Sequence, residues 1–244
     1  MTYLILRLAT LGNVAMTVPV IASLSKRYPN DRFIVASKKK LDAMFATMPN
    51  VTFHEVDNRL DWNGVVALWR RLRDEVDAVI DLQKIPKTIV LGSLMRLSGK
   101  PVTRIHYGRL RRHLITAFGI GKTPLPSEFA RYRDAFRRAG LETDETFESL
   151  PKNDTVAKMV ADTFGEKKGR WIGLAPFAKS KSNMLPYRVT KDIIDKLSQD
   201  ADTRIFLFGA GKVECEMLRQ WAKVFPRTES VAGRLQLKEE LELM

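Results

Sequence analysis

The chain has 244 residues, of which 45% are hydrophobic and 28% are charged, a composition typical of globular proteins with one or two domains. Lysine and arginine outnumber aspartate and glutamate by 41 to 28, giving a formal net charge of +13. This excess favours a polyanionic partner such as nucleic acid, a phosphorylated glycolipid or an anionic membrane surface. No run of about 18 apolar residues is present, so no transmembrane helix is expected. The single cysteine, Cys215, excludes an intrachain disulfide and fits a reducing compartment.

The N-terminal part alternates short β-branched segments with amphipathic ones. In the segment 14–28, apolar residues recur at the spacing of one helix face. Such alternation predicts an α/β fold with a doubly wound parallel sheet. The expected strands are residues 3–8, 32–36, 51–56, 78–82 and 102–106. The expected helices are residues 14–28, 62–74, 88–97 and 127–139.

The turn between the first strand and the first helix is the strongest candidate for a binding site. In open α/β sheets, ligands bind at the carboxyl ends of the strands. Gly12 allows a tight turn and leaves space for a ligand. Asn13 is expected to cap the first helix and to face the ligand-binding cleft at the carboxyl ends of the strands. The alternative is that Asn13 is a purely structural cap. Pro19 is expected to bend the second turn of that helix.

The C-terminal part begins with a second α/β pattern. The polar segment 141–154, interrupted by Pro151, is expected to link two domains. We expect an N-terminal Rossmann-like domain over residues 1–150, a linker and helix over 151–169, and a partial Rossmann-like domain over 170–244. The expected strands of the second domain are residues 171–175, 204–208 and 228–231. Its expected helices are residues 190–199, 212–224 and 237 onward.

Several short segments, in order, resemble glycosyltransferase family 9, the heptosyltransferase-like enzymes that use ADP-heptose to build lipopolysaccharide. The most specific segment is Leu-Arg-Leu-Ala-Thr-Leu-Gly-Asn-Val-Ala-Met-Thr-Val-Pro, which ends at Pro19. The other segments are individually weak, but they follow the order of the family. They are Val79-Ile-Asp-Leu-Gln83, Leu174-Ala-Pro-Phe-Ala178, Phe208-Gly-Ala-Gly211 with Glu214, and Val231-Ala-Gly-Arg-Leu-Gln-Leu237.

The resemblance implies a GT-B fold in which the N-terminal domain binds the acceptor and the C-terminal domain binds the nucleotide-sugar. It implies an inverting transfer of heptose, or a similar sugar, from ADP-heptose to a phosphorylated lipopolysaccharide core acceptor. It also implies a cytoplasmic protein peripheral to the inner membrane, with no cofactor. A general base would deprotonate the acceptor hydroxyl, and cationic groups would stabilise the leaving diphosphate.

The catalytic position is where this sequence departs from the family. Members carry an aspartate as the base, and Asn13 stands in its place. An amide does not accept a proton near neutral pH, and the loss of a general base lowers the rate by about 10²–10⁴-fold. Thr10 and Gly12, in the same loop, are expected to lie beside the acceptor. Arginines are expected to hold its phosphate, with a solvated basic face as the alternative. They are Arg104, Arg109, Arg111 and Arg112.

The residues expected to bind the nucleotide-sugar donor lie in two loops and at the start of the helix that follows the second. Lys179, Lys181 and Asn183 are expected to face the diphosphate, although members often place a lysine where Asn183 stands, and the two lysines could instead be solvated. Gly209 and Gly211 form a turn before a helix, which suits a nucleotide at the helix N-terminus. The resemblance assigns Glu214 to the ribose hydroxyls, with helix capping as the alternative.

Other interpretations remain open at this point. Family members continue beyond the segment that ends here at Met244, so a fragment or a truncated product is expected, with an incomplete donor site. A catalytically impaired relative that binds a sugar nucleotide or an anionic glycan is the main alternative. Nucleic-acid binding rests on charge alone, since no recognition helix or aromatic-studded strand is evident. His54, His106 and His113 lack metal-ligand spacing.

Overall fold

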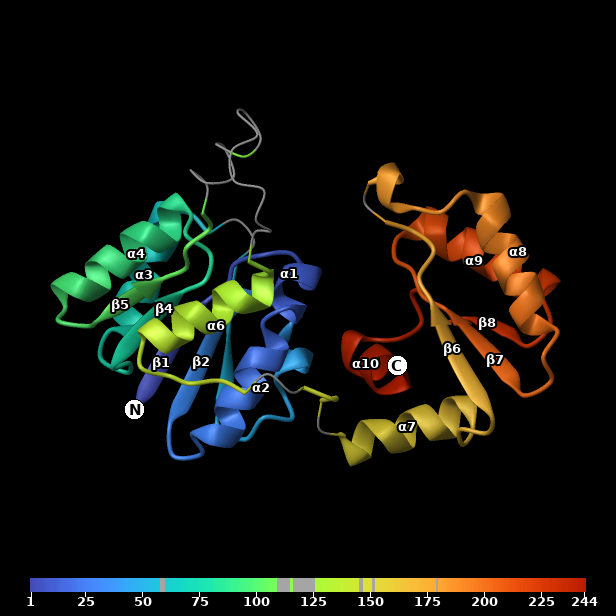
Figure 1. Ribbon diagram of the computed structural model, residues 1–244, viewed down its shortest axis with the longest axis horizontal. Coiled ribbons are helices and arrows are strands. Elements are labelled where there is room, and N and C mark those ends of the chain that lie inside the picture. The colour runs from blue at the N-terminus through green and yellow to red at the C-terminus, as the bar shows by residue number, and fades with distance from the viewer. Residues whose placement is uncertain (58–59, 109–114, 116–125, 145–146, 151, 179) are drawn as a thin grey trace. The chain divides into compact units, whose positions relative to one another are not determined.

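The computed structural model describes residues 1–57, 60–108, 115, 126–144, 147–150, 152–178 and 180–244. The chain divides into two compact units, Met1–Pro151 and Lys152–Met244. Each unit is built on its own parallel sheet, as the alternating pattern predicted (Figure 1). Among the helices of the described residues, none is long and apolar enough to cross a bilayer.

The first unit contains a five-stranded parallel sheet in the order β3-β2-β1-β4-β5. The order reverses between β1 and β4, and this is the switch point where open α/β sheets bind ligands. The strands are β1 (Thr2–Leu6), β2 (Arg32–Lys38), β3 (Val51–Val56), β4 (Ala78–Asp81) and β5 (Val102–Arg104). The helices are α1 (Leu11–Ala15), α2 (Val18–Arg27), the 3₁₀ turn η1 (Asp42–Met44), α3 (Trp62–Leu72), α4 (Pro86–Leu97) and α6 (Glu128–Arg138).

Both faces of this sheet are covered, and β1 is therefore almost wholly buried. Leu4 and Leu6 join a core cluster that includes Leu72 of α3 and Met95 of α4. On the alternate positions of the strand, Tyr3 stacks on Phe33 with 5.6 Å between the ring centroids. Successive side chains of a strand point to opposite faces, so a continuous apolar run is what a strand covered on both sides requires.

The helix expected over residues 14–28 is interrupted. α1 ends at Ala15 and α2 begins at Val18, and Thr17 between them donates its hydroxyl to the Val14 carbonyl at 2.6 Å. Pro19 therefore lies in the first turn of α2, where its missing N–H is tolerated, and the expected bend within one helix was wrong. Thr10, rather than Asn13, occupies the N-cap of α1.

The segment after α6 is fastened to α2. The backbone N–H of Glu142 donates to the Tyr28 hydroxyl at 2.9 Å, and that of Asp144 donates to Ser23 Oγ at 2.7 Å. The Asp144 carboxylate also pairs with Arg27 at 3.0 Å. The first residues of the segment expected to be a linker are therefore held on the first unit.

The second unit has a three-stranded parallel sheet in the order β6-β7-β8, with helices on both faces. α7 and α10 contribute Val160 and Leu243 to the core on one face, and α8 and α9 contribute Ile194 and Leu218 on the other. Cys215 is buried on α9. The strands are β6 (Arg170–Leu174), β7 (Thr203–Leu207) and β8 (Thr228–Ser230). The helices are α7 (Asp154–Phe164), the 3₁₀ turn η2 (Lys181–Asn183), α8 (Tyr187–Ser198), α9 (Lys212–Val224) and α10 (Leu237–Leu243).

An ion cluster joins β7, β8 and the segment that follows β8. Glu229 accepts from Arg204 and from Arg234, each at 2.8 Å. The Arg204 guanidinium lies 4.9 Å from the ring centroid of Phe206 and 5.5 Å from that of Trp171. Burial by itself raises the pKa of Glu229, but the two guanidiniums outweigh it and hold that pKa below the usual value.

The Glu229 cluster predicts a pH-dependent stability of the second unit. A carboxyl whose pKa is lowered on folding stabilises the fold above its unfolded pKa, and this stability is lost as the pH falls through the folded pKa. We expect the unfolding midpoint of the wild type to fall more steeply below about pH 5 than that of Glu229→Gln. Urea unfolding followed by the fluorescence of Trp171 and Trp221 measures this. Parallel pH profiles for the two proteins would contradict it.

Candidate functional site

A buried arginine occupies the switch point of the first unit. Arg7 directly follows β1 and is 4% exposed. Its Nη1 donates to the Leu82 carbonyl at 2.8 Å and to the Tyr107 hydroxyl at 2.9 Å, and its Nε donates to the Asn13 carbonyl at 3.3 Å. The guanidinium also lies 5.3 Å from the ring centroid of Tyr132 on α6. One side chain therefore fixes the end of β1, the α1 turn, the end of β4 and α6.

Asp81, the last residue of β4, is wholly buried beside this point. Its Oδ1 accepts from the backbone N–H groups of Gln83 and Lys84 at 2.9 and 2.8 Å. Its Oδ2 lies 3.9 Å from Arg104 Nε, and no hydrogen bond is made by either atom within the described part of the chain. Asp81 thus shapes the turn after β4, and its lack of solvent exposure argues against a role as the base that Asn13 does not provide.

The predicted acceptor loop is open to solvent. Thr10, Gly12 and Asn13 are exposed, and Asn13 Nδ2 donates to Thr10 Oγ1 at 3.1 Å. A Cβ atom at Gly12 would meet no heavy atom within 4 Å, so this position is not crowded by the described residues. The polar group that faces Asn13 is thus a hydroxyl, which does not serve as a base.

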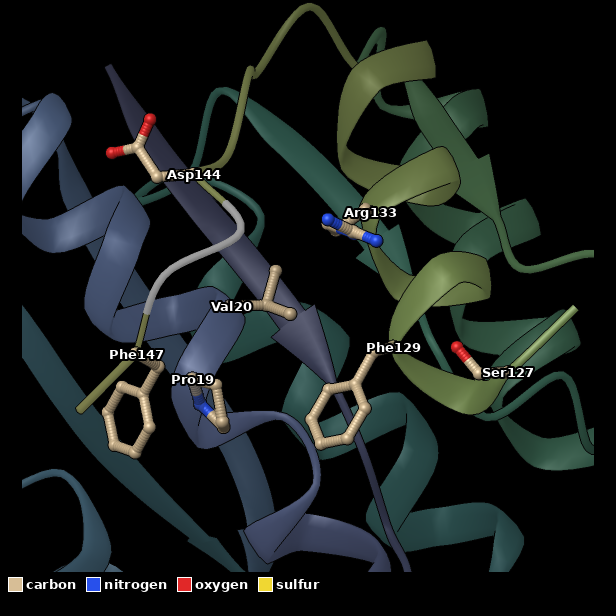
Figure 2. A pocket seen from close by; sticks show the side chains of 7 residues that line it. All are labelled: Pro19, Val20, Ser127, Phe129, Arg133, Asp144 and Phe147. Carbon is tan, nitrogen blue, oxygen red and sulfur yellow. The ribbon is translucent and has the colours of Figure 1, made fainter. Parts of the chain in front are cut away.

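A pocket of about 400 Å³ lies between α2 and α6. Figure 2 shows Pro19 and Val20 of α2 facing Phe129 and Arg133 of α6, with Phe147 beside Pro19. Phe129 and Arg133 are four residues apart and therefore share one face of α6. Of the expected site residues that the structure describes, none lines this pocket. The described residues that line it are Pro19, Val20, Ser127, Phe129, Arg133, Asp144 and Phe147.

Arg104 lies in a different concavity, a groove of about 560 Å³ along β5. The other expected acceptor arginines, Arg109, Arg111 and Arg112, fall outside the described residues. The groove is lined by Lys84, Arg96, Val102, Thr103, Arg104, His106 and Arg138.

In the second unit, the turn from β7 to α9 has the geometry that two glycines permit. A Cβ atom at Gly209 would lie 2.7 Å from Leu218 Cδ1, and Gly211, the N-cap of α9, has a φ of 84°. Glu214 Oε2 accepts from the backbone N–H of Ala210 at 3.0 Å. Glu214, in the first turn of α9, therefore holds the backbone that leads into the helix, and its second carboxylate oxygen has no part in that bond.

A groove of about 650 Å³ lies beside this turn, between the segment that follows β6 and the first turns of α9. Of the expected donor residues, Lys181 and Glu214 line it, whereas Asn183, Gly209 and Gly211 do not, and Lys179 falls outside the described residues. Sequence motifs did not assign a role to its aromatic and thioether side chains. The lining consists of Phe177, Ala178, Lys181, Met184, Leu185, Pro186, Tyr187, Val213, Glu214 and Met217.

An aromatic cluster supports the floor of this groove. Phe177, Tyr187 and Trp221 make pairwise ring contacts with centroids 5.8 to 6.3 Å apart. The Lys191 ammonium lies 5.7 Å from the Trp221 ring centroid. The groove therefore combines an apolar, aromatic surface with one lysine and one carboxylate on its wall. Among the described residues, no group of three or more histidine, cysteine, aspartate or glutamate side chains is arranged to hold a metal.

Comparison with known proteins confirms the resemblance stated above. No family model matches the chain. A stretch of 108 residues, 44% of the chain, is 28% identical to the lipopolysaccharide core heptosyltransferase OpsX of Haemophilus influenzae, and it spans 30% of that protein. The matched segment is therefore less than a third of the length of this curated relative.

Solved structures confirm the GT-B fold over the whole chain. E. coli heptosyltransferase WaaC, with ADP-2-deoxy-2-fluoro heptose, matches with a TM-score of 0.71 and 18% identity, over 100% of this chain and 79% of that one. A glycosyl transferase of family 9 from Veillonella parvula matches with a TM-score of 0.71 and 17% identity, over 98% of this chain and 70% of that one. E. coli ADP-heptose lps heptosyltransferase II matches with a TM-score of 0.68 and 18% identity, over 100% of this chain and 76% of that one.

The contacts of Arg7 predict that it stabilises the first unit. Arg7→Met removes donors from two buried acceptors, and we expect it to lower the free energy of unfolding by about 2–3 kcal/mol. Arg27→Met, which removes an exposed ion pair, is the matched control, with an expected loss below about 1 kcal/mol. Urea unfolding followed by circular dichroism measures both. Equal losses for the two variants would show that Arg7 has no special role at the switch point.

Proposed function

We propose that this chain is a heptosyltransferase-like glycosyltransferase of lipopolysaccharide core synthesis, with ADP-heptose as donor and a phosphorylated core glycolipid as acceptor. Similarity to the OpsX sequence and a GT-B fold shared with heptosyltransferases support the class. The observation that carries the proposal is the groove of the second unit, where Lys181 and Glu214 meet an aromatic surface. That combination matches the three chemical parts of a nucleotide.

Each part of the donor has a matching group in this groove. The Lys181 ammonium suits the diphosphate, which carries negative charge that grows on the leaving group during transfer. The Glu214 carboxylate suits the two ribose hydroxyls, because an ionised carboxylate is an acceptor only. Phe177 and Tyr187 offer ring surfaces for the base. We assign these three roles to the donor groove.

The acceptor side is assigned to the α1 turn and to the pocket between α2 and α6. The turn presents Thr10 and Asn13 to solvent at the switch point. The pocket places the Arg133 side chain across from Pro19 and Val20 (Figure 2), and the Asp144 carboxylate on its lining is paired with Arg27. This arrangement suits a ligand with both anionic and apolar parts. A glycolipid with phosphate groups has this composition.

The transfer is a single displacement in which the acceptor hydroxyl oxygen bonds to the anomeric carbon while the bond to the diphosphate breaks. Asn13 Nδ2 is engaged with Thr10, and this leaves Oδ1 to accept a hydrogen bond from the attacking hydroxyl. Asn13 therefore orients the hydroxyl, but the proton passes to water because the amide does not take it up. The expected enzyme is slow for this reason.

The alternative proposal is a relative that binds a sugar nucleotide or an anionic glycan without turnover. It is favoured by Asn13 itself, whose described polar partner, Thr10, cannot replace the missing carboxylate. The two proposals share the donor groove and differ in catalysis, so binding and turnover must be measured separately.

Nucleotide binding tests the donor groove. We expect the chain to bind ADP more tightly than UDP or GDP in isothermal titration calorimetry. Glu214→Gln and Lys181→Ala are each expected to weaken ADP binding about tenfold, since each loses a contact to a charged group. Lys167→Ala, an exposed lysine of the same unit outside the groove, is the control. Binding that is unaffected by both groove variants would remove the donor assignment.

Restoring the carboxylate tests catalysis. Asn13→Asp is expected to raise the rate of heptose transfer from ADP-heptose by about 10²–10⁴-fold, because a general base then takes the hydroxyl proton. Asn13→Ala is the control, which removes the amide without supplying a base. The position is exposed, so both substitutions are tolerated by the fold. If Asn13→Asp binds ADP and shows no gain in turnover, the alternative proposal is correct.

A further inference from the structure

The groove along β5 has a strongly cationic lining that includes Arg104, which is expected from the sequence at the acceptor phosphate but which does not line the pocket assigned above to the acceptor. Among the described residues, four lysine and arginine side chains and one histidine line it, and no acidic side chain does. It lies along β5, the last strand of the sheet of the first unit, whereas Asn13 belongs to α1, which follows the central strand β1. Figure 1 shows β5 and α1 in different parts of this unit. The cations are Lys84, Arg96, Arg104 and Arg138, and the histidine is His106.

Two of these arginines are anchored by the open edge of the sheet. The Pro101 carbonyl accepts from Val79 N, and Ile105 N donates to the Asp81 carbonyl. The backbone polar groups of residues 101 and 105, on either side of β5, therefore face β4. By alternation, the carbonyls of residues 102 and 104 face away from β4. Arg96 Nη2 donates to the first of these at 2.9 Å, and Arg138 Nη2 donates to the second at 2.8 Å.

Each guanidinium retains further N–H donors after making these bonds, because arginine has five. Arg138 uses another of them on Asp134, which lies outside the groove lining, at 2.9 Å. The side chains are held in place before any ligand arrives, so little conformational entropy is lost on binding. The open edge of β5 thus presents two fixed guanidiniums.

The buried carboxylate of Asp81 positions the other two cations. It accepts the backbone N–H of Lys84, which holds that residue at a φ of 50°, and it faces Arg104 Nε at 3.9 Å. Arg104 Nη2 also donates to the Ile89 carbonyl at 3.1 Å, and it passes so close to Gly92 that a Cβ atom there would lie 2.9 Å away. A wholly buried acid therefore organises cations on the floor of a groove that it does not itself line.

We propose that this groove is a second anion site that binds a phosphate monoester. A phosphate monoester carries close to two negative charges near neutral pH and several acceptor oxygens. It therefore matches fixed guanidinium and ammonium donors better than a single carboxylate does. The site contains neither Asn13 nor a residue of the donor groove. The proposal can therefore be tested separately from sugar transfer. The monoester is carried either by a soluble sugar or by a lipid headgroup.

The test uses the 244-residue chain at about 0.15 M salt, where weak surface attraction is screened. Glucose 6-phosphate is titrated and followed by ³¹P NMR, and the titration is repeated with Lys181→Ala to exclude a contribution from the donor groove. A parallel arm measures co-sedimentation with phosphatidylcholine vesicles that contain phosphatidic acid, against phosphatidylcholine alone. Binding in the first arm identifies a soluble monoester, and binding in the second alone identifies a lipid headgroup. Either result supports the proposal.

Lys84→Asn is the decisive variant. Asparagine tolerates the positive φ of this position while removing the charge. We expect it to weaken binding about tenfold in whichever arm the wild type binds, with an unchanged unfolding midpoint. Lys167→Asn, an exposed lysine of the second unit, is the control and should bind as the wild type does. No binding in either arm, or equal binding by Lys84→Asn and the wild type, overturns the proposal.

Discussion

The burial of the Arg7 guanidinium sets the geometry of the first unit. A parallel sheet of order β3-β2-β1-β4-β5 separates the connections that leave β1 and β4. Moving a cation out of water is costly unless its donors are satisfied. In the described structure, Arg7 meets this cost with carbonyl and hydroxyl oxygens and the Tyr132 ring, and burial raises the pKa of Tyr132 so that the ring stays neutral. The α1 turn that carries Asn13 is fixed as a consequence.

Acidic side chains in both units each serve two cations, which suits a chain with many more basic than acidic residues. Glu229 binds Arg204 and Arg234, and Asp134 binds Arg137 and Arg138. Asp81 differs in that it approaches one cation, Arg104, at 3.9 Å and accepts the backbone N–H of Lys84. Shared carboxylates keep neighbouring cations in fixed positions despite their mutual repulsion. The basic surface is therefore organised locally, around a small number of acids.

Local patterns in the sequence predicted the elements well, and the errors have physical causes. The bounds of β3 and α9 match the expected 51–56 and 212–224, because apolar periodicity and flanking turn residues define both. The single helix over 14–28 failed because Pro19 cannot donate to the carbonyl of Ala15, so the helix must restart. Asn13 suits a cap by type, yet Thr10 occupies that position.

Much of the candidate site could not be predicted, because it depends on contacts between distant segments. Phe177 precedes the η2 turn in the sequence and Tyr187 follows it, and only the folded chain brings both rings into contact with Trp221. Phe129 and Arg133 lie on one helix face, but the pocket exists because residues of α2 and Phe147 face them. Position in the loop pointed to Lys181 and the resemblance pointed to Glu214, but neither predicted the surfaces around them.

Arg96 and Arg138 bind the β5 carbonyls that face away from β4, and this also affects whether the sheet can pair with a strand of another molecule. An unprotected edge strand is a template for a strand from another chain, and this is a common route to strand exchange and aggregation. Here an incoming strand must first displace Arg96 and Arg138 from the carbonyls that it needs. Its approach would also desolvate the two guanidiniums, which costs free energy. The terminal strand of the sheet is therefore partly protected against pairing with a strand of another chain.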